Sequence, residues 1–572
     1  MNDHYDRLFG DFIARLDGSG DPLLAASAAL AARAVRLGHS CCDLAAPPEG
    51  LPLLPPAEWR RKLLGFPRVI SETTATPLVM FEDKLYLQRY ALDEAELADR
   101  LRRLGRKRAD FDPAATAASL AALFPAGNDP GNAEFRQKLA ALTAARSHLA
   151  IISGGPGTGK TYTAARIIRL LGEGRKIKLA APTGKAAARL QESLTAAGMT
   201  FDCSTIHRLL GLHPETGAPL FHAENPLDCD LLLLDEVSMI PLTLLAKVAA
   251  ALPDHASLIL LGDRNQLSSV EPGCVFADLL DAASPECFSD DFARDAAPVF
   301  GEVFAAGFPE RSNSPFADVS VELTVSRRFD PDGTLGRAAA AVPHVTSESD
   351  SRAIVELVRQ SRTDLAAFTL PPHGDFGRSA EFRSLLREHL GPLKNAATVS
   401  AAFAALDAFR ILGAVRRGSS GAVALNELAT RLLYGRGDRT FYHNMPLMIV
   451  RNDVENRLFN GDVGIVRQEH GQFRAWFPDR EGDYRSLPVA LLPPFEPAFA
   501  MTVHKSQGSE FDRVALILPE RSEFVSRELF YTALTRARKG AFLFFDDQEL
   551  IRTLLRPVRR SGGLAARLRA AI

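Results

Sequence analysis

Several features that would assign this 572-residue chain to a protein class are scarce or missing. Its six cysteines form no C-x-x-C pair and no spacing typical of a metal site. We therefore expect reduced, mostly buried thiols. No apolar run reaches the length of a membrane span, and charged residues interrupt the N-terminal apolar residues, so we expect neither a span nor a signal peptide. These absences predict a soluble, cytoplasmic protein.

An excess of charge of one sign is also absent. Lysine and arginine number 67 against 69 acidic residues, which gives a net charge of −2. A surface for nucleic acid would therefore have to be local, or be completed by a partner. We find no separate carboxylate cluster suited to nuclease chemistry. The length indicates roughly three to four domains.

What the chain does contain is a phosphate-binding signature within residues 148–171. This stretch reads as a buried strand, a glycine-rich turn and a helix, and the turn fits G-x-x-x-x-G-K-[ST]. The backbone N–H groups of such a turn and the positive end of the helix form an anion site. We expect Lys160 to reach the β- and γ-phosphates of ATP and Thr161 to hold Mg²⁺. The expected ATP cradle is Gly154, Gly155, Pro156, Gly157, Thr158, Gly159, Lys160 and Thr161.

Two later apolar strands end in acidic or amide side chains. Asp235 and Glu236 follow the run 231–234, and Gln266 follows the strand near 257–262. Open α/β sheets place ligands at the carboxyl ends of their strands. We expect Asp235 to hold Mg²⁺ through water, Glu236 to orient and deprotonate the attacking water, and Gln266 to sense the γ-phosphate.

Other polar residues carry weaker signals. Gln137, on a helix before the phosphate-binding strand, could read an adenine edge, although an ordinary surface glutamine fits nearly as well. Thr183 and Lys185 follow a short strand, so they could contact phosphate or belong to a solvated turn. His207 lies at a helix start, and a lone histidine is usually structural.

Arginines appear late in the chain in two places. Arg327 and Arg328 follow a β-like run, from which an arginine can reach ATP. Arg536 lies on a helix that precedes an apolar strand. We expect it to be supplied from a second lobe and to neutralise charge in the transition state, an effect of roughly 10³–10⁵ in rate.

The pattern of elements divides the chain into three parts. Residues 1–110 read as a helical N-terminal domain, either a scaffold or a docking module, and 111–315 read as a first α/β lobe. A β-hairpin is expected near 212–228. Residues 316–572 form a second lobe, into which alternating short strands and turns at about 443–495 insert a small β-barrel.

The order of motifs is itself informative. The phosphate loop is followed by APTGKAAARL, TIHRLLG, LLLLDEVSM, GDRNQLSSVEPG, NRLFNGDVGIV, TVHKSQGSEF and YTALTRAR. This set resembles superfamily 1 DNA helicases and, more closely, the RecD family, the alpha subunit of bacterial exodeoxyribonuclease V (RecBCD). The matching blocks run from about residue 137 to 539.

The resemblance implies an α/β protein with two RecA-like P-loop NTPase lobes, ATP and Mg²⁺ between them, and an inserted SH3-like β-barrel. It assigns adenine reading to Gln137 and makes Arg328 and Arg536 the second-lobe arginines. It also implies 5′-to-3′ movement on single-stranded DNA and at duplex ends, in a heterotrimer with RecB-like and RecC-like subunits, one of which would hold the nuclease centre. The residues at the family's DNA-contacting positions are Thr183, Lys185, His207, Thr502 and His504.

One position departs from the family, and three other interpretations stay open. An aromatic residue commonly precedes the motif-four arginine, but Arg327 is there in this chain, so Arg327 or Arg328 could face ATP. The alternatives are a stand-alone RecD-like helicase, a docking subunit with a vestigial nucleotide site, and a motor that tracks RNA.

Overall fold

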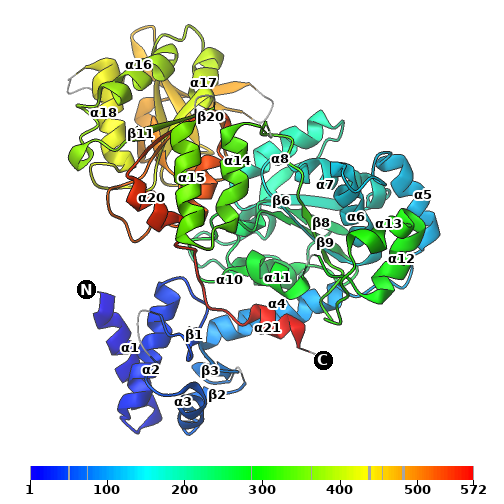
Figure 1. Cartoon of the computed structure of the whole chain (residues 1–572). Helices are drawn as coiled ribbons and strands as arrows, with labels where there is room; N and C mark the ends of the chain where they lie inside the picture. Colours follow the sequence, from blue (N-terminus) through cyan, green and yellow to red (C-terminus); the bar gives the residue numbers. More distant parts are fainter. Residues whose placement is uncertain are drawn as a thin grey trace.

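The structure is a computed structural model, and it describes residues 2–48, 52–73, 75–284, 286–330, 332–361, 364–435, 440–453, 455–479 and 483–570. These residues form an N-terminal domain, two parallel-sheet lobes and an inserted antiparallel sheet (Figure 1). All six cysteines are free thiols, as expected. Across the described part of the chain, no helix combines the length and apolar character of a membrane span.

The N-terminal domain is only partly helical. A small four-stranded sheet accompanies the helices, so the prediction of a helical domain over residues 1–110 is wrong in this respect. Its strands are two to four residues long, and Glu82 makes the tight turn between β3 and β4 at φ +50°. Strands this short leave little alternation to read in a sequence. The elements are α1 (Asn2–Asp17), α2 (Pro22–Arg36), β1 (Cys42–Asp43), α3 (Pro56–Leu63), β2 (Ile70–Ser71), β3 (Leu78–Phe81), β4 (Lys84–Leu87) and α4 (Gln88–Leu104).

Lobe 1 is a six-stranded sheet in the order β10-β5-β9-β8-β6-β7, and every neighbouring pair is parallel. Helices cover both faces, so β5, β8 and β9 are buried along their whole length, as the apolar runs predict. The strands are β5 (Leu149–Gly154), β6 (Ile177–Ala181), β7 (Cys203–Thr205), β8 (Leu231–Leu234), β9 (Ser257–Gly262) and β10 (Ser320–Leu323). The helices are α5 (Pro113–Leu123), α6 (Ala133–Arg146), α7 (Lys160–Leu171), α8 (Gly184–Ala196), α9 (Ile206–Leu209), η1 (Val237–Met239), α10 (Leu242–Ala251), α11 (Val275–Ala283), α12 (Asp290–Phe300) and α13 (Glu302–Gly307).

Two sequence predictions about lobe 1 are wrong. Strand β10 pairs with β5, so the lobe extends past the predicted boundary at residue 315. The partner of β10 lies far away in the sequence, so the local pattern around residues 321–324 does not indicate it. The predicted hairpin at 212–228 has no strands; it consists of turns, one of which is closed by an isolated bridge between His222 and Asn225.

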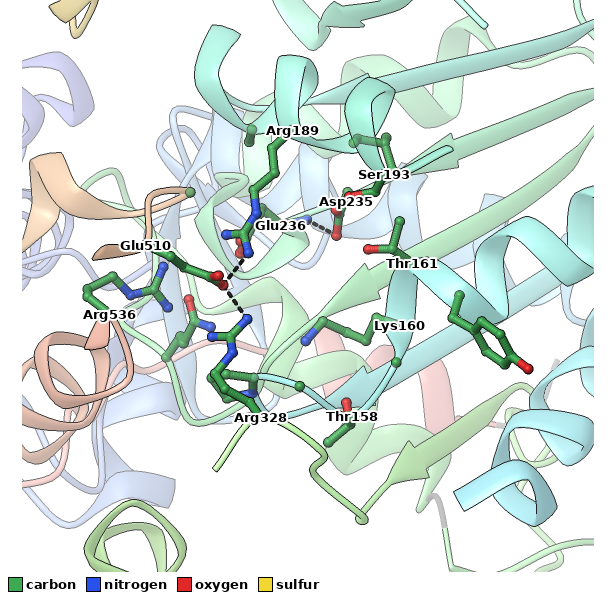
Figure 2. Close-up of a pocket in the computed structure, with 18 residues that line it drawn as sticks. Thr158, Lys160, Thr161, Arg189, Ser193, Asp235, Glu236, Arg328, Glu510 and Arg536 are labelled. Carbon is green, nitrogen blue, oxygen red and sulfur yellow. Dashed lines mark hydrogen bonds and ion pairs between the residues drawn. The ribbon is translucent and has the colours of Figure 1, made fainter. Parts of the chain in front are cut away.

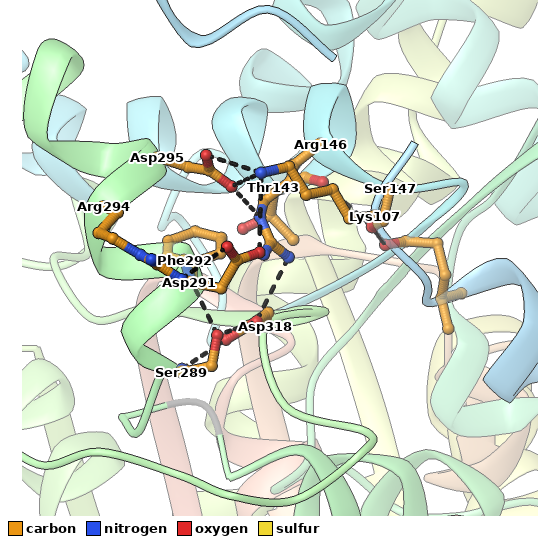
Figure 3. A network of polar contacts seen from close by, with 11 residues as sticks. Lys107, Thr143, Arg146, Ser147, Ser289, Asp291, Phe292, Arg294, Asp295 and Asp318 are labelled. Carbon is orange, nitrogen blue, oxygen red and sulfur yellow. Dashed lines mark hydrogen bonds and ion pairs between the residues drawn. The ribbon is translucent and has the colours of Figure 1, made fainter. Parts of the chain in front are cut away.

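A polar network joins three segments of lobe 1 (Figure 3). The guanidinium of Arg146, at the end of α6, donates to Asp295 at 2.8 Å, to Asp291 at 2.6 Å and to Asp318 at 3.3 Å. It also lies 5.2 Å from the centre of the Phe292 ring. Arg146 is 4% exposed. One buried cation therefore fixes α12 and the segment before β10 to the helix that leads into the phosphate-binding strand.

Replacing Arg146 with alanine should lower the free energy of unfolding of lobe 1 by about 3 kcal/mol, because Asp295 and Asp318 lose their buried partner. Among the described residues, only the half-buried Lys107 still pairs with Asp295, at 2.8 Å. Urea denaturation followed by circular dichroism measures the loss. Arg294→Ala is the matched control, since this side chain is 76% exposed and its one ion pair among the described residues is with Asp291, at 3.1 Å. We expect it to cost less than about 1 kcal/mol. Equal losses in the two variants would contradict the role of Arg146.

Lobe 2 has a five-stranded parallel sheet in the order β11-β20-β19-β12-β18. Helices α14, α15, α19 and α20 pack on one face, and α16, α17 and α18 on the other. The strands are β11 (Leu365–Thr369), β12 (Phe409–Gly413), β18 (Ala500–Thr502), β19 (Phe511–Ile517) and β20 (Ala537–Phe545). The helices are α14 (Thr334–Ala341), α15 (Glu348–Gln360), α16 (Ala380–Lys394), α17 (Val399–Ala408), α18 (Ala422–Tyr434), η5 (His504–Ser506), α19 (Arg527–Leu534) and α20 (Asp547–Leu554).

The predicted β insertion in lobe 2 is present as an antiparallel sheet in the order β16-β15-β14-β13-β17. Residues 454 and 480–482 of the predicted range lie outside the described residues. Within the described part, β16 and β17 do not pair with each other, so closure into an SH3-like barrel is not confirmed. The strands are β13 (Met445–Ile449), β14 (Val463–Glu469), β15 (Gln472–Pro478), β16 (Tyr484–Pro488) and β17 (Phe495–Pro497).

The C-terminal segment leaves lobe 2 after α20 and returns to the other parts of the molecule (Figure 1). Arg560 donates to the carbonyls of Glu271 and Gly273 in lobe 1, both at 2.8 Å. The next residue, Ser561, donates its backbone N–H to His39 of the N-terminal domain at 2.8 Å. The last helix, α21 (Leu564–Arg569), packs on α4 and α11. The predicted domain 316–572 therefore ends outside its own lobe.

Candidate nucleotide site between the two lobes

The phosphate loop joins β5 to α7. Gly157 and Gly159 have φ values of +79° and +86°, which side chains other than glycine rarely adopt. A Cβ at Gly157 would lie 2.4 Å from the Cβ of Arg328. The ammonium of Lys160 donates to the carbonyls of Gly154 at 2.6 Å and Gly155 at 3.2 Å, so the side chain lies across the loop.

Two carboxylates stand opposite this loop at the end of β8 (Figure 2). Asp235 accepts a hydrogen bond of 2.8 Å from the N–H of Glu236, and Glu236 has the left-handed conformation, with φ +53°. Burial, and then the charge of Glu236, raise the pKa of Asp235 to about 6. A half-buried pair of carboxylates next to the Thr161 hydroxyl is a donor set that suits Mg²⁺.

Gln266 lies beyond the end of β9 and lines the same cavity. Its amide N–H donates to Asp263 at 3.2 Å. The Oε1 atom of Gln266 is buried and accepts no hydrogen bond among the described residues. A buried amide oxygen without a donor is suited to receive one from a water molecule or a ligand in the cavity.

Lobe 2 closes the cavity from the opposite side. The space has a volume of about 230 Å³ and is bounded by the phosphate loop, the carboxylates, Gln266, α8 and lobe 2. Arg536 is buried and donates to the carbonyls of Thr532 at 3.0 Å and Ser509 at 3.1 Å. The residues that line the cavity from lobe 2 are Gly508, Glu510 and Arg536.

The segment after β10 places one of the two neighbouring arginines at the cavity. The N–H of Arg327 donates to the carbonyl of Gly157 at 2.9 Å, which holds the segment against the phosphate loop. Arg328 lines the cavity and forms an ion pair with Glu510, whereas Arg327 is exposed and does not line it. Because Arg328 follows a strand of lobe 1, the expectation that it belongs to the second lobe is wrong.

Gln137 lies behind the phosphate loop, outside the cavity lining. It is 3% exposed, and its amide N–H donates to the carbonyl of Thr158 at 3.1 Å. Its Oε1 accepts no hydrogen bond among the described residues. The structure thus gives Gln137 a structural contact with the loop and leaves the adenine role a prediction.

The five predicted DNA-contacting residues occupy carboxyl ends of strands in both lobes. Thr183 caps α8, Lys185 lies in its first turn, and His207 is exposed on α9. Surrounding protein atoms, and then nearby arginines, lower the pKa of Lys185 to about 8. Thr502 ends β18 and lines a second cavity, of about 260 Å³, while His504 begins η5.

The polypeptide just after β9 is held by lobe 2. The N–H of Leu267 donates to the hydroxyl of Thr532 at 2.8 Å, and its carbonyl accepts from the amide of Gln507 at 2.8 Å. The hydroxyl of Tyr531 donates to Asp263 at 3.1 Å. The segment that carries Gln266 therefore spans the boundary between the lobes.

The sequence interpretation missed Arg189 and Glu510, which line the cavity. Both lie inside motifs that were recognised, APTGKAAARL and TVHKSQGSEF. Arg189 is four residues after Lys185 on a helix, a spacing that places both side chains on one face. This spacing is the sequence feature that could have identified Arg189 as a candidate site residue.

Three family models match the chain. The N-terminal domain of the RecBCD enzyme subunit RecD matches residues 3–86, the AAA domain matches 137–272, and the UvrD-like helicase C-terminal domain matches 497–544. Together with the shared cavity, they define a two-lobed P-loop ATPase of the helicase class.

Curated relatives then specify the family. The RecBCD enzyme subunit RecD of Mycolicibacterium smegmatis is 33% identical, over 95% of this chain and 93% of that protein. The Haemophilus influenzae protein of the same name is 34% identical, over 75% and 71%. The chain therefore belongs to the RecD family. The ATP-dependent RecD2 DNA helicase of Deinococcus radiodurans is 32% identical, over 69% of this chain and 46% of that protein. Among solved structures, a Bacteroides Pif1 helicase in complex with ADP-AlF3 and ssDNA has a TM-score of 0.39 at 18% identity, over 73% of this chain and 93% of that one.

Proposed function

We propose that this chain is an ATP-dependent DNA helicase that moves 5′ to 3′ as a subunit of a cytoplasmic RecBCD-type complex in double-strand break repair and recombination. The observation that carries the proposal is the shared cavity. Lys160, Asp235 and Gln266 enter it from lobe 1, and Arg536 enters it from lobe 2. Such a cavity changes shape when the lobes move, which a motor requires.

Each cavity residue then has a proposed role. Lys160 binds the β- and γ-phosphates of ATP, and Thr161 and Asp235 would hold Mg²⁺, which would neutralise phosphate charge. Glu236 accepts a proton from the attacking water, and Gln266 orients that water. Arg328 and Arg536 contact the terminal phosphate.

The lobe boundary supplies the proposed coupling to movement. Arg328 and Arg536 favour a closed cleft while a terminal phosphate is bound, and this preference ends when the phosphate leaves. Lobe 2 holds the Gln266 segment through Leu267, so a change at Gln266 would be transmitted to lobe 2. If the two lobes bind DNA tightly in alternation, each closure of the cleft would move the protein along the strand.

The proposed DNA track runs over the five residues named above, which would contact the sugar–phosphate backbone of a single strand. Contacts of this kind carry no base sequence, so binding should be non-specific and sensitive to salt. RNA remains the alternative track. We also propose that Gln137 reads adenine and that the inserted five-stranded sheet is the SH3-like accessory module of the family.

Helix α1 supports a role within a larger complex. Four of its apolar side chains lie at helical spacing on the solvent side, with exposed fractions of 70%, 45%, 53% and 49% for Tyr5, Leu8, Phe12 and Leu16. The helix lies at the outer edge of the N-terminal domain (Figure 1). A contiguous exposed apolar stripe marks a protein interface. The first RecBCD relative aligns with 95% of this chain and the RecD2 relative with 69%, which favours the complex over a stand-alone helicase.

Phe12→Asp should abolish co-purification of this chain with RecB-like and RecC-like subunits, because it puts a charge into the apolar stripe. The ATPase activity of the isolated variant should be unchanged, since α1 is remote from the cavity. Arg7→Asp, a polar substitution on the same helix, is the control and should retain the partners. Normal co-purification of the Phe12 variant would show that the partner interface lies elsewhere on the protein.

The helicase proposal itself is tested with tailed duplexes. The chain should unwind a duplex with a 5′ single-stranded tail and leave one with a 3′ tail intact. Single-stranded DNA should stimulate its ATPase activity more than RNA does. Equal unwinding of both substrates would contradict the proposed 5′-to-3′ polarity. Stronger stimulation of ATPase activity by RNA would indicate that the protein moves on RNA.

A further inference from the structure

Arg189 lines the cavity and has no role in the scheme above. It lies on α8, one turn beyond Lys185, and its guanidinium forms an ion pair with Glu510 of lobe 2. The same carboxylate also pairs with Arg328. In Figure 2, Glu510 lies between these two arginines, with Arg536 beside it.

The lobes approach closely where this ion pair forms. Gly508, two residues before Glu510, has φ +70°, and a Cβ there would lie 3.2 Å from the Cβ of Ala186 on α8. The loop that carries Glu510 is therefore seated directly on the helix that carries Arg189. This contact places the Arg189 guanidinium at the cleft, although the side chain is 38% exposed.

Charge in this corner of the cavity is unbalanced. Four cations line the cavity against three carboxylates, and the one carboxylate in this corner, that of Glu510, is shared by Arg189 and Arg328. The cations are Lys160, Arg189, Arg328 and Arg536, and the carboxylates are Asp235, Glu236 and Glu510. Arg536 donates only to backbone carbonyls among the hydrogen bonds described. Although burial opposes ionisation, Arg328 and Arg189 hold the pKa of Glu510 below its usual value. The corner keeps an excess of positive charge that suits a more highly charged anion than a carboxylate.

We propose that Arg189 is a third arginine that contacts the terminal phosphate of ATP, and that Glu510 is the carboxylate which that phosphate replaces as the partner of Arg189. The inference rests on the proposed ATPase function and adds a residue that distinguishes triphosphate from diphosphate. Arg189 and Arg328 share one carboxylate, so a terminal phosphate entering the cavity would compete with Glu510 for both guanidinium groups.

Equilibrium binding of fluorescent nucleotides to the full chain tests this directly, with Mg²⁺ present and without hydrolysis. The probes are the β,γ-imido analogue of ATP, and ADP. Arg189→Ala should weaken binding of the imido analogue by about 10- to 100-fold, because a charge-assisted contact is lost, and should leave ADP binding within about twofold. Arg189→Lys keeps the charge without the fork of donors and should be intermediate. Arg169→Ala is the matched control, since Arg169 donates to the carbonyl of Ala197 just beyond α8, far from the cavity.

The outcomes test the role of Arg189 separately from the proposed ATPase function. Selective loss of the imido analogue in Arg189→Ala, with Arg169→Ala like wild type, supports a phosphate contact. Equal weakening of both nucleotides, or of neither, overturns the role of Arg189, because an ion pair that only positions α8 cannot distinguish the nucleotides. If circular dichroism shows that the alanine variant is misfolded, the test uses Arg189→Lys and its affinity for the imido analogue divided by its affinity for ADP. A ratio equal to that of wild type overturns the inference, and a lower ratio supports it. If the wild-type chain binds neither nucleotide, the proposed function fails as well.

Discussion

Replacing Lys160 with glutamine is expected to reduce ATP hydrolysis by at least roughly a thousandfold and to eliminate DNA unwinding, while binding of single-stranded DNA persists. The Lys160 ammonium lies across the phosphate loop, 2.6 Å from the carbonyl of Gly154. Glutamine is shorter and carries no charge, so it cannot neutralise the β- and γ-phosphates. The expected DNA contacts lie on other elements and should be unaffected.

Release of inorganic phosphate, unwinding of a 5′-tailed duplex and anisotropy of labelled DNA measure the three properties of the Lys160 variant. Lys176→Gln is the matched control, because this lysine is 65% exposed and pairs with Asp228 at 2.7 Å, outside the cavity. The control should behave as wild type. ATPase activity that DNA still stimulates in the Lys160 variant would overturn the assignment of the nucleotide site.

Arg536→Ala is expected to bind ATP nearly as tightly as wild type and to hydrolyse it about 10³–10⁵ times more slowly. The difference arises because an arginine from the second lobe acts mainly on charge that develops in the transition state. Arg536 lines the cavity on the side opposite the phosphate loop and is 2% exposed, so water cannot replace its guanidinium easily.

Single-turnover hydrolysis and equilibrium binding of a non-hydrolysable analogue separate the two effects of the Arg536 substitution. Arg538→Ala is the control from the same motif, because Arg538 is 46% exposed and pairs with Asp512 at 3.0 Å, away from the cavity. Unchanged turnover in Arg536→Ala would mean that this arginine only packs between α19 and its neighbours. Loss of binding and hydrolysis to the same extent would indicate a ground-state contact.

The parts of the site that could be predicted from sequence are those built by adjacent residues. The phosphate loop and the Asp235–Glu236 pair each depend on one strand and the turn after it, so local order fixes their geometry. The alternation of apolar strands and helices similarly predicted two parallel-sheet lobes. Gln266 also lies where the sequence suggests, at the end of a strand beside the cavity.

The parts that could not be predicted depend on contacts between distant segments. The pairing of β10 with β5 joins residues far apart in the chain, and it moves Arg328 from lobe 2 to the end of a lobe 1 strand. The ion pair between Arg189 and Glu510 exists only after the lobes meet. Strands β1 and β2, with two residues each, owe their existence to tertiary pairing rather than to propensity.

The C-terminal segment tethers lobe 2 to the rest of the molecule and so limits how far the two lobes can separate. Only the nine residues 555–563 separate α20 of lobe 2 from α21, and Arg560 anchors their middle to the backbone of lobe 1. A fully extended residue spans at most about 3.6 Å, so a connection this short limits the distance over which lobe 2 can move away from lobe 1. Any larger excursion would have to pull Arg560 from Glu271 and Gly273, in the stretch of chain that also bears Gln266. Wide opening of the cleft is thus coupled to the loss of the Arg560 contacts with lobe 1.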